Sequence, residues 1–181
     1  MNDQLDVLRE VVAGLEQEGI AYMVSGSTAL NYYAEPRMTR DIDIVIELGP
    51  HETARFEQIF SDDFYLDKAV IEQAVRDRGM FNLIHLGRVV KVDFIVRKDS
   101  EYRRLEFSRR RRVEAEGLTL HLVSPEDLIL SKLEWARQGP SELQLRDVHS
   151  VVDSVPNLDW HYIRSWAGTL ELLPLLEKAI G

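Results

Sequence analysis

Cysteine is absent from this 181-residue sequence. The chain therefore has no disulfide framework and no thiolate metal site. No apolar run approaches the length of a membrane span, and residues 1–6 are acidic, unlike a secretory or mitochondrial targeting segment. These absences predict a cytoplasmic protein with no membrane partner.

Positive charge is also scarce, since 22 Lys and Arg face 31 Asp and Glu, for a net charge of −9. This balance argues against broad nucleic-acid binding driven by net charge. One local exception is an arginine cluster made of Arg103, Arg104, Arg109, Arg110, Arg111 and Arg112. We favour a salt-bridged, solvated edge for this cluster because glutamates surround it, with a contact surface for RNA or phosphate as the alternative.

The pattern of apolar residues predicts an α/β (α+β) fold. Residues 1–123 are expected to form a small mixed β-sheet core flanked by helices, and residues 124–181 a helical C-terminal region that completes the cleft. The expected strands are 20–24, 40–46, a hairpin over 80–96 that turns at Gly87-Arg88, and 118–123. The expected helices are 3–18, 28–33, one opened by Pro50 that carries Phe56 to Phe60, then 68–76, 125–137, 141–154, 159–168 and 170–179.

Three aspartates in two of these strands carry the strongest chemical signal. Because side chains alternate along a strand, Asp41 and Asp43 share one face, and Asp93 lies opposite the apolar face of its own strand. If the two strands are neighbours, three carboxylates converge and need a counter-charge. A pair of Mg²⁺ ions is the simplest candidate, because hard divalent cations prefer carboxylate oxygens.

A glycine-serine turn, Gly26-Ser27, stands between an expected strand and an expected helix. Such a turn is common punctuation, but it also suits a phosphate, which would meet backbone amides and the Ser27 hydroxyl. The thirteen residues between Ser27 and Asp41 leave room for one helix and a return loop. Turn and carboxylates are therefore expected in one cleft.

Two charged residues on the later helices stand out by position. Lys132 falls on the apolar stripe of its helix, where it must either reach water or meet an anion, so a triphosphate and a structural salt bridge are both open. Asp147 lies beside another apolar stripe and is expected to pair with Lys132 or to orient an acceptor. Arg37 and Thr39 precede the aspartate strand and are read either as phosphate contacts or as turn residues.

In combination, Gly26-Ser27, Asp41-Ile42-Asp43-Ile44 and the later Asp93 resemble the pattern of the DNA polymerase β-like nucleotidyltransferase superfamily. Within it, the run Arg37-Met38-Thr39-Arg40-Asp41-Ile42-Asp43 is similar to the Arg-x-Thr-x-Asp-h-Asp run of the AbiEii toxin-like branch, where h is hydrophobic. Lys132-Leu133 and Arg146-Asp147 match two further features of that branch. The likeness covers roughly residues 20–155.

The resemblance implies transfer of a nucleoside monophosphate from an NTP to an acceptor hydroxyl, with release of pyrophosphate. It implies that Asp41 and Asp43 hold two Mg²⁺ ions and that Asp93 binds the catalytic ion and accepts the hydroxyl proton. Gly26 and Ser27 would hold the β- and γ-phosphates, with Lys132, Arg37 and Thr39 as further NTP contacts. RNA or protein is the implied acceptor, and a cognate antitoxin the implied partner.

Two other functions stay open. The first is a small-molecule nucleotidyltransferase of the antibiotic-modifying kind, because an acidic cleft would attract cationic aminoglycosides. The second is a non-catalytic nucleotide-binding protein on the same fold. A homodimer is a further expectation, drawn from the apolar C-terminal run formed by Leu170, Leu172, Leu173, Leu175 and Leu176.

Overall fold

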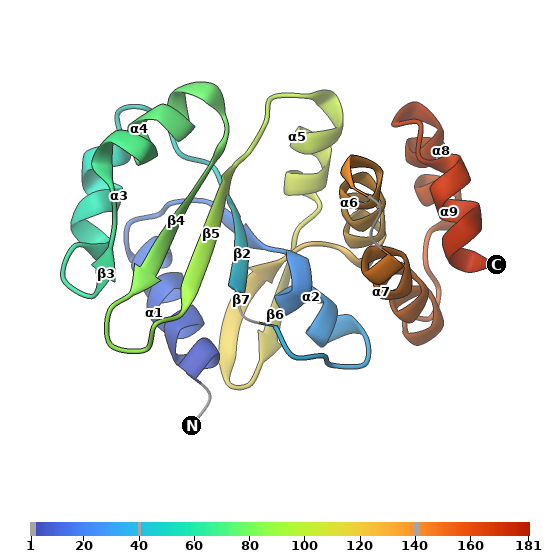
Figure 1. The fold of residues 1–181 in the computed structure, drawn as a ribbon, viewed down its shortest axis with the longest axis horizontal. Coiled ribbons are helices and arrows are strands. Elements are labelled where there is room, and N and C mark those ends of the chain that lie inside the picture. Colours follow the sequence, from blue (N-terminus) through green and yellow to red (C-terminus); the bar gives the residue numbers. More distant parts are fainter. Residues whose placement is uncertain (1–2, 40, 140–141) are drawn as a thin grey trace.

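A mixed sheet of seven strands, in the order β3-β4-β5-β2-β1-β7-β6, runs through the residues that the structure describes (Figure 1). The structure is a computed structural model, and it describes residues 3–39, 41–139 and 142–181. Helices flank this sheet and follow it, so the expected mixed α/β fold is confirmed. Arg40, Pro140 and Ser141 lie outside the described residues, as does the first residue of the helix expected at 141–154.

The elements follow the sequence patterns closely. The strands are β1 (Tyr22–Val24), β2 (Asp41–Ile46), β3 (Phe64–Tyr65), β4 (Met80–His85), β5 (Lys91–Val96), β6 (Arg111–Ala115) and β7 (Leu118–Leu122). The helices are α1 (Asp3–Gln17), α2 (Gly26–Tyr33), α3 (Thr53–Phe60), α4 (Lys68–Asp77), α5 (Glu101–Ser108), α6 (Pro125–Gln138), α7 (Glu142–Ser154), α8 (Trp160–Thr169) and α9 (Leu173–Ile180).

Strand β2 is central because its two neighbours bring the remaining chemistry to it. It pairs in parallel with β5 and antiparallel with β1. The backbone N–H of Ser25, just after β1, donates to the carbonyl of Asp43 at 2.9 Å. The start of α2 is therefore fixed beside the middle of the aspartate strand.

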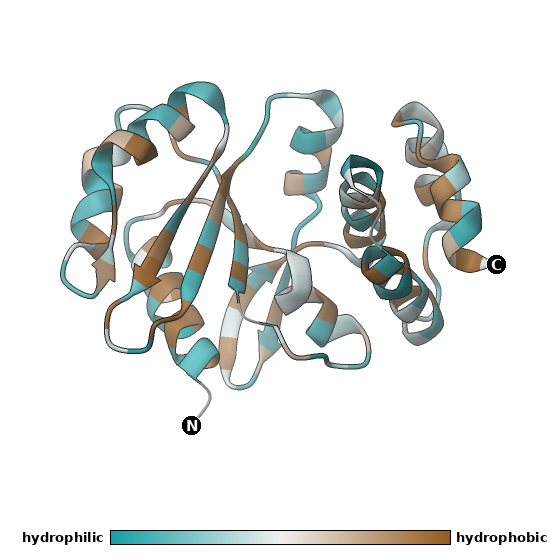
Figure 2. Ribbon diagram, viewed as in Figure 1, coloured by the Kyte–Doolittle hydropathy of each residue, from teal (hydrophilic) through white to brown (hydrophobic). Residues whose placement is uncertain are grey.

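One face of β4, β5 and β2 is buried under α1 and α3. Phe56 and Phe60 of α3 pack on Phe94 of β5, and Phe56 also meets Phe81 of β4. Burial alternates along β4, as expected for a strand with one face in the core, and Figure 2 shows hydrophilic bands between hydrophobic stretches in β4 and β5. The aspartates of β2 and β5 belong to the opposite face.

Four helices, α6 to α9, gather at one end of the molecule (Figure 1). Helix α6 begins as expected, because the Ser124 hydroxyl accepts the N–H of Asp127 and Pro125 occupies the first turn. We propose a division near residue 124, since β7 ends at Leu122 and the elements described after it are helical. Buried apolar residues of both parts join one core cluster. Within the described chain, no helix combines the length and apolarity needed to cross a bilayer.

Several expected details differ from the structure. The hairpin does not turn at two residues: β4 ends at His85 and β5 begins at Lys91, and the His85 ring nitrogen Nδ1 accepts the N–H groups of Gly87 and Arg88. Helix α9 begins at Leu173 rather than at 170, because Glu171 has a positive φ of 59° and reverses the chain. Sequence reasoning missed β3, α5 and β6.

Candidate active site

The carboxylates of Asp41, Asp43 and Asp93 project from two adjacent strands. In the β2–β5 ladder, Asp43 lies directly opposite Asp93, while Ile42 pairs with Val92 on the buried face. Asp93 is buried, and the Asp41 side chain is 44% exposed. The row of carboxylates therefore runs from a sheltered end to an open one. The aspartates lie on the face opposite Ile42 and Val92, as the alternation of side chains predicted.

Lys91 lies within this row, and sequence reasoning missed it. Its Nζ atom is 2.9 Å from Oδ2 of Asp93 and 3.2 Å from Oδ2 of Asp41. These contacts raise the pKa of the Lys91 ammonium, the Asp93 contact most of all. The available signal was its position two residues before Asp93, which places both side chains on one face of β5.

Asp43 forms the sheltered centre of the row, beneath the glycine-serine turn. Burial is the main cause that raises the pKa of its carboxyl, and the nearby charge of Asp93 adds to it. Lys132 and a hydrogen bond from the Ser27 backbone act in the opposite direction. Gly26 has a φ of +58°, and a Cβ atom there would overlap the Asp43 carboxylate. Only glycine fits this position.

A second cluster, the Ser27–Arg37–Asp147–Lys132 cluster, adjoins the carboxylates. The Arg37 guanidinium donates to both oxygens of Asp147, at 3.1 and 3.0 Å, and to the Ser27 hydroxyl at 2.7 Å. Lys132 reaches the same carboxylate, with Nζ 2.7 Å from Oδ2. The expected Lys132–Asp147 pair is present, with both side chains buried.

This cluster joins three segments: the first turn of α2, the loop after α2, and the α6–α7 helix pair. The loop itself is held by Asn31 of α2, which accepts the Arg37 N–H at 3.0 Å and donates to the Arg37 carbonyl at 2.9 Å. Asn31 was missed because an asparagine inside a helix carries no pattern of its own. Thr39 precedes β2, and its hydroxyl donates to the Asp41 carbonyl at the start of that strand, at 2.9 Å.

The side chains present fit divalent cations by their chemistry. Carboxylate oxygens are the donors that Mg²⁺ prefers, and the Lys91 ammonium already stands as a cation between Asp41 and Asp93. In the described parts of the chain, no three His, Asp or Glu side chains are drawn into a ready-made metal cage. The Lys91 ammonium lies between Asp41 and Asp93, within 3.2 Å of an oxygen of each.

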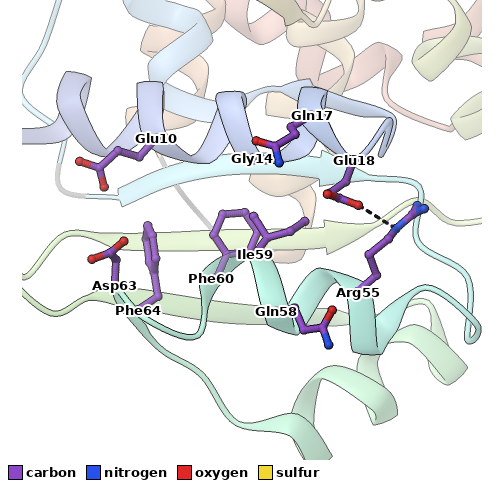
Figure 3. A pocket seen from close by; sticks show the side chains of 10 residues that line it. All are labelled: Glu10, Gly14, Gln17, Glu18, Arg55, Gln58, Ile59, Phe60, Asp63 and Phe64. Atoms are coloured by element: carbon purple, nitrogen blue, oxygen red, sulfur yellow. Dashed lines mark ion pairs between the residues drawn. The ribbon is translucent and has the colours of Figure 1, made fainter.

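A half-open hollow of about 470 Å³ lies elsewhere, between α1 and α3 (Figure 3). Its lining includes Glu10, Gly14, Arg55 and Phe60. Because Phe60 packs on Phe94, this hollow belongs to the helical layer on the face opposite the carboxylates. None of the sequence-predicted site residues lines it.

Four of the six arginines of the cluster make ion pairs within the chain, in agreement with the salt-bridged interpretation. Arg103 pairs with Glu106 and Glu134, and Arg109 pairs with Asp127 while stacking over Tyr162. Arg104 and Arg111 pair with Asp99 and Glu126, respectively. These contacts fasten α5 and β6 to α6 and α8.

Three solved structures share the fold. The antibiotic-resistance factor ANT(2'')-Ia, also solved with adenylyl-2''-tobramycin, is 16% identical with a TM-score of 0.58, over 93% of this chain and 95% of that chain. The lincosamide antibiotic adenylyltransferase LnuA, solved with lincomycin, is 11% identical with a TM-score of 0.57, over 86% and 98%. An antigenic nucleotidyltransferase-like protein from Paracoccidioides brasiliensis is 19% identical with a TM-score of 0.58, over 99% and 93%.

At these identities the structural matches speak for the fold alone, and no curated protein matches the chain significantly. The sequence itself is more specific. Residues 8–149 match the nucleotidyl transferase AbiEii toxin of the type IV toxin–antitoxin system. That segment contains the glycine-serine turn, the three aspartates, Lys132 and Asp147. The chain therefore belongs to the AbiEii nucleotidyltransferase toxin family.

Proposed function

We propose that the chain is a Mg²⁺-dependent enzyme that moves a nucleoside monophosphate from an NTP to the hydroxyl of an RNA or protein acceptor. The observation that carries the proposal is the register of β2 and β5, which sets Asp43 opposite Asp93 directly beneath the Gly26-Ser27 turn. Asp41, Asp43 and Asp93 would hold two Mg²⁺ ions, which when bound neutralise charge on the attacking and leaving oxygens.

The remaining groups bind and orient the nucleotide. The Gly26-Ser27 turn opens helix α2, and Ser25 makes no side-chain cap there. A helix N-terminus favours phosphate, although the Ser27 N–H already donates to Asp43. The Ser27 hydroxyl and the cations of Arg37 and Lys132 gather beside it and suit the β- and γ-phosphates. Thr39 is a weaker candidate, since its hydroxyl already donates to the Asp41 carbonyl.

The reaction then balances in one displacement. The acceptor oxygen forms a bond to the α-phosphorus while the bond from that phosphorus to the bridging oxygen breaks, and pyrophosphate leaves. Asp93 accepts the proton of the acceptor hydroxyl. Asp147 takes no part in bond making; it holds Arg37 and Lys132 in place.

The test is a thermal-shift panel of the four NTPs, each with and without Mg²⁺. At about 100 times its dissociation constant a ligand adds ~2.7 kcal/mol, which is a shift of several degrees. We expect a shift that requires Mg²⁺, that depends on the base, and that is lost in Asp43→Ala. Asp62→Ala, an exposed aspartate in the turn after α3, serves as the matched control and should shift like wild type. No shift with any NTP at millimolar concentration would contradict the proposal.

A small-molecule acceptor is the second candidate. The net charge of −9 would attract cationic antibiotics. Two proteins of the same fold are an antibiotic-resistance factor and a lincosamide antibiotic adenylyltransferase. Transfer of label from an α-³²P-labelled NTP separates the two. Label in cellular RNA or protein supports the first candidate, and label in an aminoglycoside or lincosamide supports the second. Mg²⁺–NTP binding without transfer to any acceptor would favour a nucleotide-binding protein without turnover.

The proposal places the reaction in the cytoplasm, where NTPs are supplied, with a cognate antitoxin as partner. A homodimer through the C-terminal leucines has less support. Leu172 and Leu176 are fully buried within the chain, and Leu173 alone of the run is exposed, at 39%. The apolar C-terminal run is therefore used mainly for the chain's own core.

A further inference from the structure

The ammonium of Lys91 stands between two of the carboxylates that the proposed function assigns to metal. Its Nζ atom lies 2.9 Å from Asp93 Oδ2 and 3.2 Å from Asp41 Oδ2. The ladder fixes this placement, because Lys91 is the direct partner of Asp41 across the β2–β5 pair and is two residues from Asp93 on the same strand face. The backbone thus places Lys91 beside Asp41 and Asp93, and its side-chain orientation completes the two contacts.

The charges show what this lysine does for the site. The three aspartates carry −3, and Lys91 and Lys132 together carry +2. Lys132 acts on Asp43, at the centre of the row, whereas Lys91 contacts Asp93 and Asp41 on either side of it. The two lysines together thus offset the repulsion between carboxylates that lie this close together.

Lys91 is also able to leave. Its side chain is 38% exposed, and the Asp41 carboxylate that it contacts is 44% exposed. Lys132, in contrast, is buried and tied to Asp147. The long, flexible side chain of Lys91 can therefore swing into water once another cation takes its place beside Asp41 and Asp93.

We propose that Lys91 occupies a divalent-cation position between Asp41 and Asp93 until a metal–triphosphate complex displaces it. Divalent metal alone then binds weakly, and metal and nucleotide enter together. The carboxylates meanwhile stay balanced and correctly placed in the ligand-free protein. This inference rests on the proposed function, since it takes the metal ligands from there.

The experiment measures Mn²⁺ binding directly, by electron paramagnetic resonance of the free ion, in wild type and Lys91→Met. We expect Lys91→Met to bind Mn²⁺ alone at least about tenfold more tightly, because the ion no longer competes with a charge-assisted contact. Lys68→Met is the matched control: Lys68 is an exposed lysine that also contacts one carboxylate, that of Glu57, and its removal should leave Mn²⁺ binding unchanged.

Two further readouts keep the proposal open to refutation. In EDTA, Lys91→Met should unfold at a lower temperature than wild type. Added Mn²⁺ should raise the unfolding temperature of Lys91→Met and remove this difference. Lys91→Arg retains the charge and should behave as wild type in both assays. Equal or weaker Mn²⁺ binding by a folded Lys91→Met protein would overturn the proposal.

Failure of this inference can be told apart from failure of the proposed function. With inorganic tripolyphosphate added as a base-independent probe, the Mn²⁺ that the protein retains in equilibrium dialysis should be nearly equal for wild type and Lys91→Met, and low for Asp93→Asn. If Mn²⁺ binds to wild type only with tripolyphosphate and Lys91→Met is no better without it, the role of Lys91 is wrong while the metal site stands. If Mn²⁺ binds to neither protein under either condition, the metal site itself is wrong.

Discussion

The backbone of Gly26 lies so close to the carboxylate of Asp43 that no side chain fits between them. The turn and the aspartate strand are therefore built as one unit, with β1 and β2 paired up to that point. Any ligand held by the turn is held directly above Asp43. This closeness makes the first prediction sharp.

Gly26→Ala should abolish the NTP-dependent thermal shift and lower stability. The new methyl group would overlap Asp43, and the positive φ of 58° adds about 1–2 kcal/mol of backbone strain. Gly19→Ala is the control: Gly19 has a similar φ of 64°, but no described atom lies within 4 Å of its Cβ position. It should show the backbone cost and keep the ligand shift. Equal behaviour of the two variants would refute steric coupling between the turn and Asp43.

Asp43→Asn should stabilise the ligand-free protein at neutral pH. Burial raises the pKa of the Asp43 carboxyl above its ordinary 3.8, so the folded state holds this proton more tightly than the unfolded chain does. Asp43 therefore lowers stability as pH rises through the window between 3.8 and the raised pKa, and the full cost is present above it. Asparagine carries no such cost and can still accept the Ser27 N–H.

We expect a gain on the order of 1 kcal/mol, or about 2–4 °C in unfolding temperature, for Asp43→Asn at pH 7. The gain should shrink as pH falls toward 3.8. Thermal melts of wild type and variant across this range, in EDTA, provide the measurement. A gain that is independent of pH would show that the charge of Asp43 is not its source.

Asp147→Ala should destabilise the protein more than Lys132→Met does. Removing Asp147 leaves the buried ammonium of Lys132 without its carboxylate and releases Arg37, a loss of about 3–5 kcal/mol. Lys132→Met leaves Asp147 with the two-pronged Arg37 contact, and about 1–2 kcal/mol is expected. Urea unfolding of both variants measures the difference. The reverse order of stabilities would mean that Asp147 does not hold the cluster together.

Away from the row of Asp41, Asp43 and Asp93, Asp127→Ala should lower the free energy of unfolding most. Asp127 is fully buried. Its carboxylate accepts hydrogen bonds from the hydroxyls of Ser124, Tyr102 and Tyr162 and from the Arg109 guanidinium. Leaving these donors without an acceptor should cost about 3–5 kcal/mol. Asp159→Ala removes only the exposed N-cap of α8 and should cost about 1 kcal/mol. Urea midpoints for the two variants would test the ranking.

The sequence predicted those features that depend on local alternation. The faces of Asp41, Asp43 and Asp93 follow from strand geometry, and the start of α6 follows from Ser124 and Pro125. Helix α5 was missed because its arginines suggested a solvated edge. A serine just before the helix, Ser100, was nevertheless a signal for its start. In the structure the Ser100 hydroxyl accepts the Arg103 N–H. Strand β3 has two residues, too short to produce a periodic pattern.

Contacts between distant segments were beyond local reasoning. That Arg37 would bind Ser27 and Asp147 together depends on how α2 and α7 meet, which no pattern within either helix records. Lys91 is two residues before Asp93 in the sequence, but its contact with Asp41 depends on which strand pairs with β5 and in which register. Tertiary pairing, rather than propensity, decides such contacts.

Because one carboxylate, Asp147, anchors both Arg37 and Lys132, the loop before β2 and the helix pair α6–α7 cannot move independently. A shift of α7 along its axis would carry Asp147 with it and withdraw the guanidinium from the Ser27 hydroxyl. The position of the Gly26-Ser27 turn is therefore linked to that of the C-terminal helices through a single carboxylate.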